Sequence, residues 1–248
     1  MASKIVIAVT GEGKTDYGIS EYNKKKAIEE WKWGPIADYI RKIADEKGKD
    51  IELVPIDRRD VDKVRLNRGA KGLDGKSLPA KRFASLMQEK DLKYGVYYCD
   101  TDKKSGSKND KSTAKKENDL VHAEVEKGLQ SDDIKAIPMV PLRMIESWIM
   151  GDIEAIEEVL GISVPTKLHP KEPEMLWGDV DDPESNYPKN YLTRMIQKSN
   201  KKFEEYETSM DDFVEFAQNS ELHNMRKNCS ISFERFYQEF CEMLDSHI

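Results

Sequence analysis

Four short apolar runs, rich in β-branched and aromatic residues, alternate along this chain with longer stretches of helical spacing. The runs lie at 4–10, 51–56, 94–99 and 134–140. Runs of this length and composition are typical of buried strands. Strands separated by helical segments favour βαβ crossovers. The sequence therefore predicts an α/β fold in which a mainly parallel sheet is flanked by helices.

The helical segments are predicted at about 21–47, 79–90, 117–129 and 144–160. The charge-rich segment 57–78 and the lysine-rich segment 103–116 are predicted to be loops. Beyond Gly161 the pattern changes: 163–190 is studded with prolines, and two or three helices follow, ending near Asp245. We therefore expect a main α/β domain at 1–162 and a C-terminal helical extension at 163–248 that packs on it.

The composition narrows the class of protein. Of the 248 residues 38% are hydrophobic and 35% are charged, so patterned apolar runs within a charged chain predict a folded protein with a highly charged surface. The net charge of −7 does not favour a general nucleic-acid-coating protein, because phosphate neutralisation requires a basic excess. No apolar run reaches the ~18 residues of a membrane span, and the N-terminus lacks a signal-peptide layout. Three widely spaced cysteines form no zinc or disulfide pattern. We expect a cytoplasmic protein without membrane contact.

Acidic residues follow two of the predicted strands. Glu12 lies between two glycines after the first strand, and Asp16 follows four residues later. Asp100 and Asp102 follow the third strand, at a spacing that returns both side chains to one side of an extended chain. Ligand sites of open α/β sheets gather at the carboxyl ends of the strands. Because crowded carboxylates favour hard divalent cations, the sequence predicts a Mg²⁺ or Mn²⁺ site.

These motifs resemble a known family. Glu-Gly-Lys-Thr-Asp at 12–16 and Asp-Thr-Asp at 100–102 are similar to the Toprim domain, which topoisomerases, bacterial primases and the overcoming-lysogenisation-defect (OLD) nucleases share. The resemblance covers roughly 4–160. Two further motifs look closest to small Toprim-like proteins found beside ATPases in phage-defence loci: Ile-Glu-Ser-Trp at 145–148 with Asp152, and Ser-Phe-Glu-Arg-Phe at 232–236.

The resemblance implies roles for the acidic residues. Glu12 would act as a metal ligand or general acid/base, Asp16, Asp100 and Asp102 would bind metal, and Glu146 would complete a second metal position. Two metal ions held about 4 Å apart activate water and stabilise the leaving oxygen in phosphodiester hydrolysis. Since no tyrosine is marked for transesterification, the expected function is a Mg²⁺- or Mn²⁺-dependent nuclease acting on DNA or RNA. An ATPase partner and a role in antiviral defence are implied by the resemblance alone. Glu146 could equally be an ordinary surface residue of its helix.

Lysines follow the second acidic motif directly. Lys103, Lys104 and Lys108 are candidates for phosphate contacts, although such a run is usually a solvated loop. The same role is open, with less support, to a set of further basic residues: Arg65, Arg68, Lys71, Lys76, Lys201 and Lys202.

Two other interpretations stay open. Residues 8–15 also fit a relaxed phosphate-binding loop, in which Gly13, Lys14 and Thr15 would make the protein an NTPase or kinase. Against this, Glu12 would repel nucleotide phosphates, and the helix required directly after Thr15 is weakened by Gly18. The third possibility is a non-catalytic interaction subunit that keeps the fold without the chemistry.

Overall fold

The computed structural model describes residues 4–23, 28–66, 72–103 and 106–246. Its centre is a four-stranded sheet built from β1 (Ile5–Gly11), β4 (Ile51–Pro55), β5 (Tyr94–Tyr98) and β6 (Lys135–Met139). The strands run in the order β4-β1-β5-β6, and every neighbouring pair is parallel. The predicted α/β class, with a parallel sheet flanked by helices, is confirmed.

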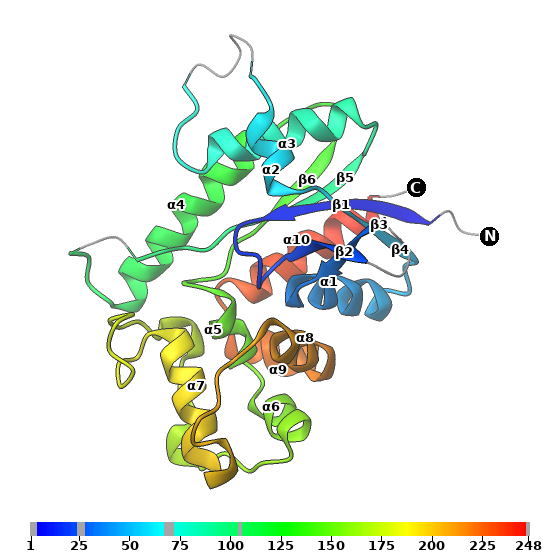
Figure 1. Ribbon diagram of the computed structural model, residues 1–248. Coiled ribbons are helices and arrows are strands. Elements are labelled where there is room, and N and C mark those ends of the chain that lie inside the picture. Colours follow the sequence, from blue (N-terminus) through cyan, green and yellow to red (C-terminus); the bar gives the residue numbers. More distant parts are fainter. Residues whose placement is uncertain (1–3, 24–27, 67–71, 104–105, 247–248) are drawn as a thin grey trace.

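Helices cover both faces of this sheet (Figure 1). One face packs against α1 (Pro35–Glu46) and α10 (Phe233–Asp245), and the other against α3 (Ser77–Glu89) and α4 (Lys111–Leu129). Pro35 starts α1 because its missing N–H costs nothing in a first helical turn. Apolar residues at helical spacing then turn one side of α1 toward the sheet.

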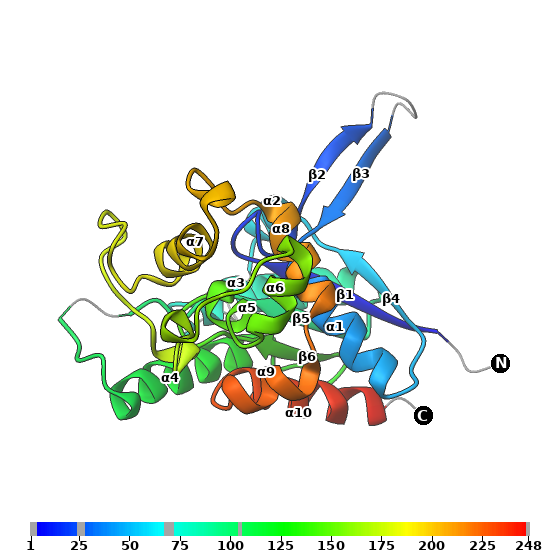
Figure 2. The same ribbon diagram turned by 90° about the horizontal axis from the view of Figure 1, so that it is seen from below.

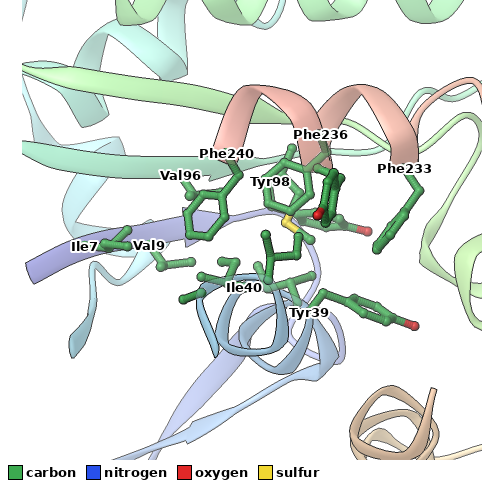
Figure 3. Close-up of a cluster of buried hydrophobic side chains, with 14 of the residues drawn as sticks. Ile7, Val9, Tyr39, Ile40, Val96, Tyr98, Phe233, Phe236 and Phe240 are labelled. Carbon is green, nitrogen blue, oxygen red and sulfur yellow. The ribbon is translucent and has the colours of Figure 1, made fainter. Parts of the chain in front are cut away.

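The larger core joins the two ends of the chain. Figure 3 shows Val9 and Val96 of the sheet between α1 and α10, whose phenylalanines Phe233, Phe236 and Phe240 point into the same cluster. Burying a side chain of this size contributes roughly 1.5–3 kcal/mol. The last helix, which was predicted as part of an extension, is thus one of the helices that cover the sheet.

Residues 18–33 differ from the prediction. A helix was expected from residue 21, but β2 (Gly18–Asn23) and β3 (Ile28–Trp33) form an antiparallel ribbon that projects from the body of the protein (Figure 2). Trp31 and Trp33 alternate with polar residues, which is the period of a strand. Gly34 separates β3 from α1, and a Cβ there would lie 2.2 Å from the carbonyl oxygen of Asp16. The backbone of Asp16 therefore leaves no room for a side chain at this position.

Two predicted loops contain helical residues. α2 (Arg58–Lys63) forms within 57–78 because Asp57 caps it, accepting a hydrogen bond from the backbone N–H of Arg59. α4 begins at Lys111 and not at 117, because Asp110 caps it in the same way through Thr113. The lysines at 111–116 therefore belong to the first turns of a helix.

The helix predicted at 144–160 is two helices, α5 (Ile145–Ile149) and α6 (Ile153–Leu160). The chain turns between them at Gly151, where a Cβ would lie 2.7 Å from Cys229 Sγ. The remaining segments are η2 (Thr166–Leu168), η3 (Pro173–Met175), α7 (Pro188–Ser199), η4 (Lys201–Phe203), α8 (Met210–Asn219) and α9 (Leu222–Asn228).

These segments share a smaller core with α5 and α6, to which Ile149, Ile156, Leu192 and Phe216 contribute. This places α7 beside α5, close to the carboxyl edge of the sheet (Figure 1). Within the described part of the chain, no helix combines the length and the apolar character that crossing a membrane requires.

Candidate functional site

A buried tyrosine joins two of the predicted acidic residues. The Tyr98 hydroxyl, at the end of β5, lies 2.6 Å from Asp100 Oδ1 and 3.3 Å from Asp16 Oδ2. Asp16 reaches it from the turn after β1, where Gly13 has φ +74° and a Cβ would lie 2.2 Å from Asp16 Oδ2. Only glycine fits this turn without strain. The parallel strands β1 and β5 therefore bring two distant carboxyl groups to one hydroxyl.

Glu146 adds a third carboxyl group to this set. It lies in the first turn of α5, just beyond the end of β6, and its residue is only 6% exposed. Burial and the negative charge of Asp16 raise the pKa of Glu146 to about 7. Glu146 is therefore a buried acid that faces the same site, and not a surface residue of its helix.

The three carboxyl groups disfavour each other's ionisation. Burial, followed by repulsion from Asp16 and from Glu146, raises the pKa of Asp100 well above its ordinary value. Burial likewise raises the pKa of Asp16, although hydrogen bonds from Thr15 and Tyr98 oppose the shift. A single tyrosine proton can donate to only one of its two carboxyl partners at a time. Burial and mutual repulsion therefore favour the protonated forms of these acids in the metal-free site.

Asp102 lies at the rim of this group. It is exposed, and its charge contributes to the raised pKa of Asp100. Burial and the charges of Glu146, Asp102, Asp100 and Asp16, in that order, raise the pKa of Tyr187. The phenol of Tyr187, which directly precedes α7, thus lies in the field of all four acidic residues. We call Asp16, Asp100, Asp102 and Glu146 the carboxylate cluster.

Glu12 lies on the other face of the sheet. In the register of β1 and β5, Gly11 pairs with Tyr98, so Glu12 comes next to Cys99 and its side chain lies on the same face of the sheet as Cys99. Asp100 lies two residues after Tyr98, so its side chain lies on the face of Tyr98. The carboxylate of Glu12 lies 2.5 Å from Lys76 Nζ and 3.8 Å from Arg58 Nη1. The structure thus brings Asp16, Asp100, Asp102 and Glu146 together and places the Glu12 side chain with cations at the next position along the sheet edge.

Basic side chains surround both groups of acids. Lys189, in the first turn of α7, lowers the pKa of both Asp16 and Glu146 through its charge. Lys76 contacts Glu12, and the charge of Asp102 also acts on it. Lys76 therefore interacts with acids on both faces of the sheet. Arg58 additionally donates to the Tyr97 hydroxyl at 2.9 Å.

Four residues of the site were not predicted from the sequence: Tyr98, Tyr187, Lys189 and Arg58. Tyr98 carried a usable signal, because it lies two residues before Asp100 and so shares its side of the strand. Tyr187 and Lys189 carried no such signal, since only the packing of α7 on α5 places them here.

The predicted phosphate-binding lysines have different positions. Lys103 is half-buried directly after Asp102, and Lys108 is exposed close to Asp110, the cap of α4. Lys76 lies at the site, as described. Arg65 is exposed, as are Lys201 and Lys202 of η4. Lys104, Arg68 and Lys71 lie outside the described residues.

The chemistry of the carboxylate cluster fits a hard divalent cation. Its donors are all oxygens, which are the ligands that such cations prefer. Among the described residues, however, no group of three or more Asp, Glu, His or Cys side chains is arranged so that it could hold a metal ion. Binding would therefore require side-chain rotation within the cluster.

Comparisons with known proteins provide no relative: no protein-family model, curated protein or solved structure matches this chain.

Proposed function

We propose that this protein is a metal-dependent nuclease of the Toprim type, which hydrolyses phosphodiester bonds in DNA or RNA with Mg²⁺ or Mn²⁺. The observation that carries the proposal is the meeting of Asp16 and Asp100 at the Tyr98 hydroxyl, with Glu146 buried beside them. Buried acids with raised pKa values gather at functional sites. Their place at the carboxyl edge of a parallel sheet is where ligands bind in open α/β folds.

Asp16, Asp100 and Glu146 would hold the cation, with Asp102 at the exposed side. A divalent ion at such a site supplies Lewis-acid stabilisation of phosphoryl oxygens and lowers the pKa of bound water. Tyr98 fixes the direction of Asp16 and Asp100 through its hydrogen bonds. Lys189 offsets part of the cluster's charge from α7.

Glu12 would serve as general base or as an additional ligand. Lys76 connects Glu12 to the carboxylate cluster, because its ammonium group contacts Glu12 and interacts electrostatically with Asp102. Lys76 and Arg58, which pair with Glu12, and Lys103, which directly follows Asp102 in the chain, would contact substrate phosphates. Lys108 would contact the nucleic-acid strand at a position farther from the carboxylate cluster.

The phosphate-binding-loop alternative has little support from the geometry. A helix N-terminus must follow the loop so that its free N–H groups face the phosphates. Here strand β2 follows at Gly18, and helix α1 begins at Pro35.

An ATPase partner and a role in antiviral defence rest on the family resemblance alone. A subunit that is silent by itself could cut only within such a complex, and a non-catalytic interaction subunit is the remaining alternative. Complex formation and biological effect that survive neutralisation of the whole carboxylate cluster would favour that alternative.

The test of the proposal is cleavage of plasmid DNA and of cellular RNA by purified protein with Mg²⁺ or Mn²⁺. Asp100→Asn and Glu146→Gln should reduce the cleavage rate at least a hundredfold. Asp132→Asn and Glu154→Gln, at exposed positions away from the cluster, are matched controls that should cut normally. Cleavage that persists in Asp100→Asn would refute the assigned site.

A further inference from the structure

We propose that a cavity next to Glu12 binds one unpaired nucleotide of the substrate strand, with its base against Trp31 and its phosphate against Lys14, Arg58 and Arg59. The cavity lies between the turn after β1, the base of the β2–β3 ribbon and the start of α2, and measures about 280 Å³. This inference rests on the proposed nuclease function, which it deepens by naming the form of the substrate.

The cavity has an aromatic wall. The rings of Tyr17 and Trp31 lie 5.2 Å apart and are inclined by 44°. Tyr17 is buried, and its hydroxyl accepts a hydrogen bond from the backbone N–H of Arg58, while the indole of Trp31 is partly exposed. Nucleobases of any identity stack on accessible aromatic side chains.

Gly18 keeps the indole in place. Its φ of +126° is open only to glycine, and a Cβ there would lie 2.6 Å from Trp31 Nε1. Trp31 therefore packs directly on the backbone of the turn. The position of the aromatic wall is thus set by the local backbone and by the antiparallel ribbon.

The cavity is also lined by basic side chains. Lys14, Arg58 and Arg59 line it together with two acids, Glu12 and Asp57. Asp57 is held by Arg59 at 2.6 Å, and Glu12 is held from outside the lining by Lys76. The lining therefore carries a net positive charge, which favours a phosphate group.

The size and position of the cavity select the form of the ligand. A volume near the lower end of the range for small-molecule sites, about 300 Å³, admits one nucleotide but not a base pair. Glu12 lines the cavity and also contacts Lys76, which lies in the field of Asp102. Under the proposed function a nucleotide bound here would lie beside Glu12, so this part of the substrate must be single-stranded or locally unpaired.

The experiment measures binding without cleavage. Fluorescein-labelled ten-nucleotide single strands and blunt duplexes of the same sequence are titrated with protein in EDTA, and anisotropy is recorded. The wild-type protein should bind the single strand at least tenfold more tightly than the duplex. Trp31→Ala should weaken single-strand binding about tenfold, whereas Trp33→Ala, the matched change on the same strand outside the cavity, should have less than a twofold effect.

A second readout guards against misfolding. AMP titrated into the wild-type protein should quench tryptophan emission saturably, and Trp31→Phe should lose this quenching while keeping the circular dichroism spectrum and melting temperature. Equal affinity for duplex and single strand, or an unchanged affinity in Trp31→Ala, would overturn the inference. Nucleotide binding that persists in a protein unable to cut with any metal, both alone and in its complex, would instead refute the nuclease function and leave the cavity assignment standing.

Discussion

The hydroxyl of Tyr98 lies 2.6 Å from the Oδ1 atom of Asp100, two residues farther along the same chain. Because residues two apart share one side of an extended strand, the tyrosine stays next to this carboxyl group, and it also reaches Asp16. The candidate site therefore depends on an uncharged residue as much as on its acids.

Tyr98→Phe should weaken cation binding without unfolding the protein. The hydroxyl lowers the pKa of both Asp16 and Asp100 by hydrogen bonding. Its loss should raise both pKa values and move the acid limb of the pH–activity profile to higher pH, with a roughly tenfold lower rate at pH 7. The stability cost should be about 1–2 kcal/mol. Tyr39→Phe, at another buried tyrosine of the same core, should leave the profile in place.

Glu146→Gln should remove a pH dependence of stability measured in EDTA. The folded-state pKa is raised from 4.5 to about 7, so between these values the folded protein holds a proton that the unfolded chain releases. The free energy of unfolding should therefore fall as the pH rises from about 4.5 to about 7, by at most ~3 kcal/mol for this group. Chemical denaturation at pH 5 and pH 8 measures the difference, which should persist in Glu154→Gln.

Lys189→Met should act through charge. The ammonium group lowers the pKa of Asp16 and Glu146, so its removal should raise both values and shift the activity profile to higher pH. Lys198→Met is the matched control, because Lys198 lies on the same helix and pairs with Glu184 at 2.9 Å. An identical shift in the control would exclude a specific effect of Lys189.

Arg143→Met should destabilise the fold by about 3–5 kcal/mol, since it leaves the Glu117 carboxylate buried without its ion-pair partner. Arg143 is fully buried and lies 2.8 Å from Glu117, between the end of β6 and α4. The double variant with Glu117→Gln should recover part of this loss. Urea denaturation measures both, and equal stability of the two variants would refute the coupling.

Local sequence patterns predicted the sheet and most of the cluster. Apolar runs that are followed by acidic residues mark the ends of strands. Asp16, Asp100 and Asp102 could therefore be predicted from the sequence as members of the cluster. The β2–β3 ribbon was missed because Ile28 and Trp31 also fit helical spacing. The position of Glu12 was accessible in principle, because strand register determines its face.

Residues brought in by tertiary packing could not be predicted. Tyr187 and Lys189 reach the site only because the segment 163–199 folds back so that α7 packs beside α5. The Trp31 cavity likewise depends on the ribbon that the helical interpretation had excluded.

The most direct measurement of the central claim is calorimetric titration of the wild-type protein with Mn²⁺ at pH 7, in two buffers of different ionisation enthalpy. We expect one or two ions to bind with release of protons, because a bound cation requires ionised carboxylates and burial raises the pKa values of Asp100 and Glu146. Asp100→Asn should bind Mn²⁺ at least tenfold more weakly, and Asp132→Asn should bind normally. Equal Mn²⁺ affinity in the wild-type protein and Asp100→Asn would contradict the account.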